Sequence, residues 1–150
     1  MNMNRVLVTF IGLLFTACVL AAEPPTLPSD ANELVYAIYK DLIEINTTHS
    51  AGDNTLAANR VADWLRAAGF AEGDIFVGGK AEKKGNLVAR LRGSGDKPPF
   101  ILLAHLDVVE AQRSDWSMDP FTLNEQDGYF YGRGTVPGGH QHSQPDPLEA

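Results

Sequence analysis

The sequence predicts an α/β fold in which helices flank a layered sheet. Three observations favour this class: two amphipathic helical patterns come first, short strand-like runs bounded by glycines follow, and a continuous apolar run, Phe100–Ala104, comes next. An apolar run without polar alternation is typical of a strand that helices cover on both faces. Helices followed by strands of this kind indicate stacked layers of helix and sheet.

Residues 1–22 have the layout of a secretory signal peptide. A polar start with Arg5 precedes an apolar run over residues 6–20, and Ala21-Ala22 stand where small residues mark a cleavage site. The run is shorter than the roughly 20 residues that span a bilayer, so we expect no stable membrane span. Residues 15–18 loosely resemble a bacterial lipobox, which leaves a lipid anchor at Cys18 as a second possibility. We therefore expect a periplasmic or secreted protein.

Two amphipathic helices are predicted next. Asp30 and Glu33 form a capping-box pattern, and apolar residues recur at helical spacing from Leu34 to Ile45. A second apolar stripe begins after a cap at Asp53 or Asn54, and Gly69 ends it in a left-handed conformation. We assign the apolar residues of both stripes to the core.

Beyond Gly73 the pattern changes to strands. Residues 75–77 and 86–92 are short runs bounded by glycines, and 100–104 is the buried strand. Residues 121–123 and 129–131 flank an Asp-Gly pair, which predicts a hairpin. Residues 136–150 have neither period nor apolar content, so we expect an aperiodic, disordered tail.

Charge and cysteine content exclude several classes of function. The net charge is −7, with 12 Lys and Arg against 19 Asp and Glu, which argues against a nucleic-acid partner because such proteins concentrate basic residues. The single cysteine, Cys18, allows neither an internal disulfide nor a thiolate metal site. Catalytic chemistry must therefore come from His, Asp, Glu, Ser or Thr.

A polar pair ends the apolar run. Side chains alternate along a strand, so His105 and Asp107 are expected on one face, at the strand end where open α/β sheets bind ligands. An imidazole there can bind a metal ion while a carboxylate orients it. A histidine near a core is more often only hydrogen-bonded, so the spacing alone leaves both interpretations open.

Three motifs in order carry a family resemblance: Ala-His-Leu-Asp-Val-Val at 104–109, Asp-Trp-Ser-Met-Asp-Pro-Phe at 115–121 and Asp-Gly-Tyr-Phe-Tyr-Gly-Arg-Gly-Thr at 127–135. With residues 60–65 and 85–91, they make the chain from about residue 30 to 135 resemble the co-catalytic zinc exopeptidases and deacylases related to carboxypeptidase G, acetylornithine deacetylase, succinyl-diaminopimelate desuccinylase and aminoacylase. The resemblance implies a zinc-exopeptidase-type sheet and hydrolysis of an amide bond in a peptide or N-acyl amino acid.

The same resemblance implies roles for individual residues. His105 matches the family's first zinc ligand, and Asp107 matches the catalytic-site carboxylate that holds this imidazole. Two zinc ions in that family polarise the scissile carbonyl and activate a bridging water. Trp116 and Pro120 are expected to shape a loop, and Arg133 to order the loop after the hairpin.

The pattern departs from the family after Thr135. Pro137 stands where the family has an Asp that bridges both metal ions, and the later Glu-Glu pair, a further acidic ligand, the distal His and the dimerisation domain do not follow. We therefore expect residues 23–135 to be the N-terminal part of a catalytic domain that retains at most one zinc ligand and lacks activity. We expect that a frameshift, or a premature end of the gene or its assembly, near codon 136 explains the change.

Two other possibilities belong to this departure. His140 and His142 are substitute ligands in principle, but they lie in the aperiodic tail, where ordering the backbone costs about 1–2 kcal/mol per residue. His49 has no evident partner in the sequence. The alternative function is that of a non-catalytic exported α/β fragment or binding module.

Overall fold

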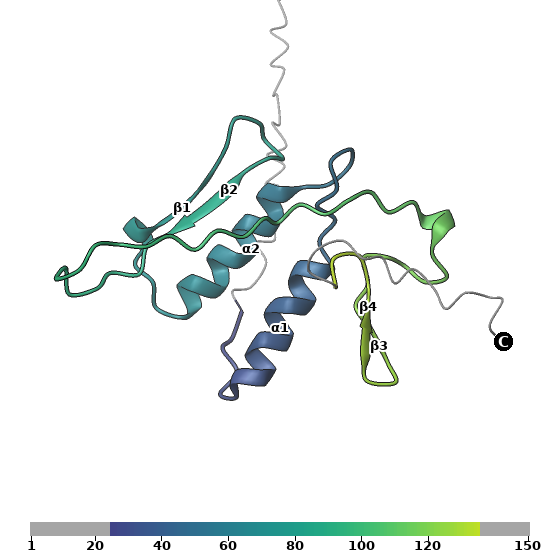
Figure 1. Ribbon diagram of the computed structural model, residues 1–150, viewed down its shortest axis with the longest axis horizontal. Helices are drawn as coiled ribbons and strands as arrows, with labels where there is room; N and C mark the ends of the chain where they lie inside the picture. The colour runs from purple at the N-terminus through teal and green to yellow at the C-terminus, as the bar shows by residue number, and fades with distance from the viewer. Residues whose placement is uncertain (1–24, 136–150) are drawn as a thin grey trace, which may run out of the picture.

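The computed structural model describes residues 25–135 (Figure 1). It contains helices α1 (Ala31–Ile43) and α2 (Asn54–Ala67), and strands β1 (Ile75–Gly78), β2 (Asn86–Ala89), β3 (Asn124–Gln126) and β4 (Tyr129–Tyr131). Short 3-10 turns cover Glu72–Asp74 and Arg113–Asp115. The predicted signal peptide, Cys18, Pro137 and the histidines of the tail lie outside the described residues.

The helix boundaries follow the predicted caps. Asp30 Oδ1 accepts hydrogen bonds from the backbone N–H of Asn32 and Glu33, at 2.8 and 3.1 Å, and begins α1. Asp53 caps α2 by accepting from the Leu56 N–H at 2.9 Å. Gly69 has φ +87° after α2, which confirms its left-handed role. Within residues 25–135, no helix is long and apolar enough to cross a bilayer.

The two helices are joined by a shared carboxylate. Asp41 Oδ2 on α1 accepts from Arg60 Nε at 2.6 Å and from Trp64 Nε1 at 2.7 Å, both on α2. The Trp64 side chain is buried, so its indole donor needs such a partner. This contact fixes α1 beside α2, as Figure 1 shows.

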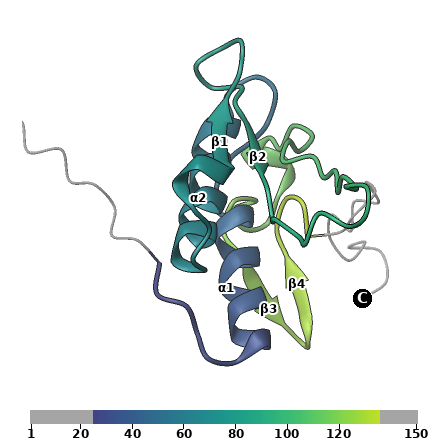
Figure 2. The ribbon, with the colours of Figure 1, turned by 90° about the vertical axis from the view of Figure 1, so that its left-hand side faces the viewer.

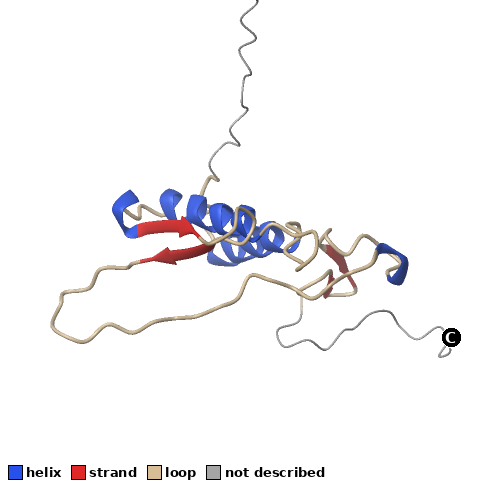
Figure 3. Ribbon diagram, turned by 90° about the horizontal axis from the view of Figure 1, so that it is seen from above, coloured by secondary structure: helices blue, strands red, loops and turns tan. Residues whose placement is uncertain are grey.

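The β1–β2 pair packs on α2 (Figures 2 and 3). Three small residues of α2, Ala57, Ala58 and Ala62, are fully buried, and such small side chains let neighbouring elements approach the helix closely. The strands are antiparallel, with Phe76 opposite Val88. These two side chains are 62% and 59% exposed, so the outer face of the pair has no cover within the described residues.

The predicted hairpin is present, with a shift in its first strand. β3 and β4 pair around Asp127 and Gly128, whose φ angles of 53° and 79° suit a two-residue hairpin turn. The first strand covers residues 124–126, not 121–123. Phe130 of β4 contacts the rings of Tyr36 and Tyr39, at centroid distances of 5.8 and 5.5 Å, which holds the hairpin against α1.

The mixed α/β class is confirmed, but the buried strand at Phe100–Ala104 is wrong for this structure. The segment is extended without pairing and crosses the molecule as a long loop (Figure 3). Its large side chains, from Phe100 to Leu103, are 81–92% exposed. An interior strand needs hydrogen-bonded neighbours and covered faces. The described residues form two separate two-stranded sheets, and neither takes this segment as a third strand.

Candidate functional site

The predicted site pair comes together in the structure. His105 Nδ1 lies 2.9 Å from the backbone oxygen of Asp107 and 3.4 Å from its Oδ1. When Nδ1 carries the proton, it donates to the Asp107 backbone oxygen and leaves the Nε2 lone pair free to bind a metal ion. The two side chains are 83% and 67% exposed, so a ligand can reach them from solvent.

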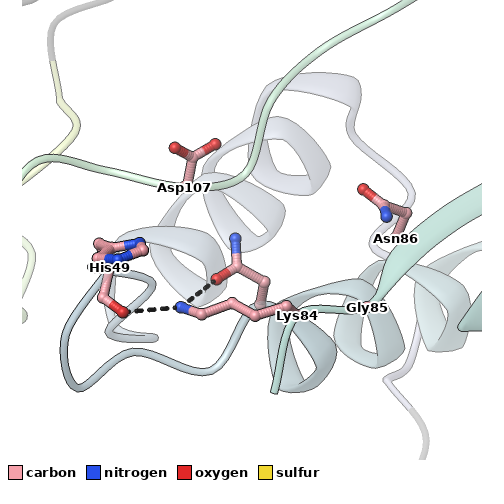
Figure 4. Close-up of a pocket in the computed structure, with 6 residues that line it drawn as sticks. His49, Lys84, Gly85, Asn86 and Asp107 are labelled. Carbon is pink, nitrogen blue, oxygen red and sulfur yellow. Dashed lines mark hydrogen bonds between the residues drawn. The ribbon is translucent and has the colours of Figure 1, made fainter. Parts of the chain in front are cut away.

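A pocket of about 230 Å³ lies on one side of this segment. Asp107 lines it together with His49, Asn54, Lys84, Gly85 and Asn86 (Figure 4). His49 has no evident partner in the sequence, and the structure places it across this pocket from Asp107. The two residues are far apart in the chain, so no spacing signal could have joined them.

Lys84 forms hydrogen bonds with several groups that line or adjoin the pocket. Its Nζ donates to the backbone oxygens of Thr48 and His49, at 3.2 and 3.1 Å, and lies 3.5 Å from Asn54 Oδ1. Figure 4 shows the hydrogen bond from Lys84 to the backbone oxygen of His49. The ammonium group therefore fixes the chain between α1 and α2 to the segment that leads into β2.

The turn between the helices, residues 46–53, is closely packed. Asn46 Oδ1 accepts from Thr48 N at 2.9 Å and from its Oγ1 at 2.8 Å. Gly52 N donates to Thr48 O at 3.0 Å, and a Cβ at Gly52 would lie only 2.2 Å from Thr48 N. This position therefore requires glycine because the backbone passes itself so closely.

The same turn holds the segment that carries the site pair. Thr47 Oγ1 donates to Leu106 O at 2.7 Å, and Val108 N donates to Thr47 O at 3.4 Å. Thr48 and Val108 form an isolated parallel bridge. The 46–53 turn and the segment with His105 and Asp107 thus run side by side, and their contacts lie at Leu106 and Val108, the two neighbours of Asp107.

Glu110 adds a second attachment. Its carboxylate accepts from Ser50 N at 2.9 Å and from Ser50 Oγ at 2.8 Å. These hydrogen bonds favour the charged form and lower the pKa of Glu110 below 4.5.

The loop before the hairpin is organised around Arg133. Its guanidinium lies 4.9 Å from the Trp116 ring centroid, and its backbone N donates to Pro120 O at 2.6 Å. Burial lowers the pKa of Arg133. These contacts agree with the architectural roles expected of Trp116, Pro120 and Arg133.

The donor set for a metal ion is small in the part of the chain that the structure describes. Residues 25–135 contain no cluster of three or more His, Cys, Asp or Glu side chains able to hold an ion. The His105–Asp107 geometry fits one imidazole ligand with its orienting oxygen. The metal role of His105 and the catalytic role of Asp107 stay predictions.

Comparison with known proteins adds a family match over this segment. Residues 101–138 match the model of peptidase family M20/M25/M40. An acetylornithine deacetylase of Proteus mirabilis is 37% identical over 106 aligned residues, covering 66% of this chain and 26% of the relative. The enzyme of the same name from Vibrio vulnificus is 33% identical over 104 residues, with the same coverage.

One relative has a higher sequence identity over a shorter aligned segment. An N-fatty-acyl-amino acid synthase/hydrolase of Xenopus tropicalis is 55% identical over 38 residues, which cover 25% of this chain and 7% of the relative. The chain thus spans about a quarter of the length of the deacetylases it matches. No solved structure gives a significant match.

Proposed function

Because residues 101–138 match the model of peptidase family M20/M25/M40, we propose that the chain belongs to a zinc-dependent hydrolase that cleaves an amide bond in a peptide or N-acyl amino acid. The observation that carries the proposal is the His105–Asp107 pair, which lies inside the matched residues 101–138 and has the geometry of an oriented metal ligand. The deacetylase and acyl-amino-acid hydrolase names of the relatives support the substrate class.

His105 would hold zinc through Nε2 while the contact of Nδ1 with the Asp107 backbone oxygen holds the ring in place. When bound, zinc polarises the scissile carbonyl and makes water a better nucleophile. The Asp107 backbone oxygen would orient the ring so that Nε2 faces a metal ion.

We further propose that this chain does not hydrolyse such substrates by itself. Two-metal hydrolysis needs ligands for both ions, and the described residues bring one imidazole and one neighbouring carboxylate together. Pro137, which has no ligating side chain, stands where the family resemblance implies the bridging Asp. The chain then contributes part of the site.

The test is zinc binding by titration calorimetry on the full chain, followed by hydrolysis of N-acetyl amino acids and dipeptides in the presence of zinc. We expect weak zinc binding that His105→Ala removes, and no hydrolysis. His49→Ala is the matched control, because His49 lines the pocket but is not assigned a metal role. Zinc binding unchanged by His105→Ala would overturn the metal assignment, and hydrolysis that depends on His105 would overturn the proposed inactivity.

A second candidate is a non-catalytic exported α/β module. The exposed apolar segment Phe100–Ala104 favours it, because contiguous exposed apolar surface is typical of an interaction site. The signal-peptide pattern of residues 1–22 supports export to the periplasm or the medium, and sequencing the N-terminus of the exported product tests it. This candidate predicts no effect of His105→Ala on any binding that the module performs.

A further inference from the structure

We propose that the 46–53 turn is the positioning element of the His105–Asp107 pair, acting through Thr47 and Ser50. The inference rests on the function proposed above and assigns residues to it that carry no ligand role themselves. Thr47 and Ser50 would act by fixing the backbone on which the ligand pair is mounted.

The segment that carries His105 and Asp107 is attached to the 46–53 turn. Within the described part of the chain, residues 98–110 are hydrogen-bonded to the 46–53 turn, through Thr47 at Leu106 and Val108 and through Ser50 at Glu110. The preceding apolar stretch is exposed and unpaired, so it does not restrain His105 from the N-terminal side. The turn therefore supplies the polar contacts that locate the pair.

The contacts of Thr47 lie on both sides of Asp107 in the chain. Thr47 binds the carbonyl of Leu106 and the N–H of Val108, which are the neighbours of Asp107 on both sides. Both peptide groups that flank Asp107 are held, so its Cα and its backbone oxygen are fixed. That oxygen is also the one 2.9 Å from His105 Nδ1. The chain of contacts thus runs from Thr47 through Asp107 to the imidazole.

The 46–53 turn is itself closely packed and hydrogen-bonded. The Thr47 and Thr48 side chains are each 2% exposed, although both are polar. Asn46 accepts a hydrogen bond from the Thr48 N–H, and Lys84 donates one to the Thr48 backbone oxygen. The backbone at Gly52 also passes close to the backbone of Thr48. A turn satisfied in this way has few alternative conformations, which is what a positioning element needs.

The test compares two charge-neutral variants with a rescue variant. Thr47→Val keeps the shape but removes the donor to Leu106, and Ser50→Ala removes one donor to the exposed Glu110 and should fold normally. Thr47→Ser restores the hydroxyl. We measure zinc affinity by calorimetry and hydrogen exchange of the Val108 amide by NMR, with urea midpoints as a measure of folding.

We expect Thr47→Val to weaken zinc binding by about 10-fold, in the range of lost support around metal ligands, and to speed exchange at Val108. Ser50→Ala should do the same to a smaller degree with its urea midpoint unchanged, and Thr47→Ser should bind zinc like the parent chain. Parent-like zinc affinity and exchange in Ser50→Ala and in folded Thr47→Val overturn the inference. If His105→Ala leaves zinc binding unchanged, the proposed function fails instead.

Discussion

Gly52→Ala tests how closely the 46–53 turn is packed. An ideal Cβ at this position lies 2.2 Å from Thr48 N and 2.4 Å from the carbonyl carbon of Thr47, whereas ordinary contact begins at 3.4 Å. Both opposing atoms belong to the backbone, so no side-chain rotation relieves the overlap. The turn must open by on the order of 1 Å, and overpacking of this kind costs about 1–3 kcal/mol.

This cost is large for a chain of this size. It corresponds to a reduction of about 5- to 150-fold in the folding equilibrium constant, since about 1.4 kcal/mol is tenfold. Opening the turn also moves Thr47 away from Leu106, so we expect the Val108 amide to exchange faster in Gly52→Ala. Urea unfolding followed by Trp fluorescence measures the first effect, and NMR exchange the second.

Gly73→Ala is the matched control. A Cβ there meets no atom within 4 Å, and its φ is not in the left-handed region. Replacing glycine at a compatible position stabilises a protein by about 0.4–1 kcal/mol through the unfolded state. If Gly52→Ala unfolds at the same urea concentration as Gly73→Ala, Gly52 does not approach Thr48 this closely and the rigidity argument fails.

Three further predictions concern the helices, the turn and the exposed segment. Trp64→Phe removes the indole donor to Asp41 and should lower the free energy of unfolding by about 2 kcal/mol in urea titrations. The pKa of the Glu110 carboxyl is lower in the folded chain than its ordinary value of 4.5. The charged carboxylate therefore stabilises the fold fully at pH values above 4.5, and this stabilisation is lost as the pH falls through the folded pKa. The stability difference between the parent chain and Glu110→Ala should therefore shrink between about pH 5 and pH 3. Leu102→Asp, at a side chain 87% exposed, should leave stability unchanged and reduce aggregation measured by light scattering.

Each of these has an outcome that contradicts it. A parent-like urea midpoint for Trp64→Phe would show that the indole bond to Asp41 contributes nothing. A pH-independent difference for Glu110→Ala would mean that Ser50 does not favour the charged carboxylate. The control for Leu102→Asp is Leu123→Asp, which places a charge at a side chain 9% exposed and should unfold the chain. If both Leu102→Asp and Leu123→Asp unfold the chain, the Leu102 side chain is not exposed to solvent.

Local interactions explain which parts of the fold could be predicted. Asp30 and Asp53 cap their helices through neighbours two or three residues away, and Asp127-Gly128 makes its turn from its own φ preferences. Such features depend on adjacent residues, so the pattern in the chain is sufficient to find them. The family motif at 104–109 is also local, so its six consecutive residues are sufficient to identify it.

The pairing of distant segments could not be predicted in the same way. The apolar run at Phe100–Ala104 predicts a buried strand, but burial also needs neighbouring strands and covering layers, and the described residues do not bring these to it. The positions of His49 and Lys84 beside Asp107 likewise depend on how the turns fold back. No spacing rule relates them.

The α/β class, the helix caps, the hairpin and the resemblance to the peptidase family all follow from the amino-acid sequence, because they depend on neighbouring residues or on an ordered series of motifs. The folded structure was needed to show that the apolar run lies exposed, and that the 46–53 turn carries the His105–Asp107 segment. The physical reason is that a hydrogen bond such as that from Thr47 to Leu106 joins groups far apart in the chain, and its partner is set by the folded geometry.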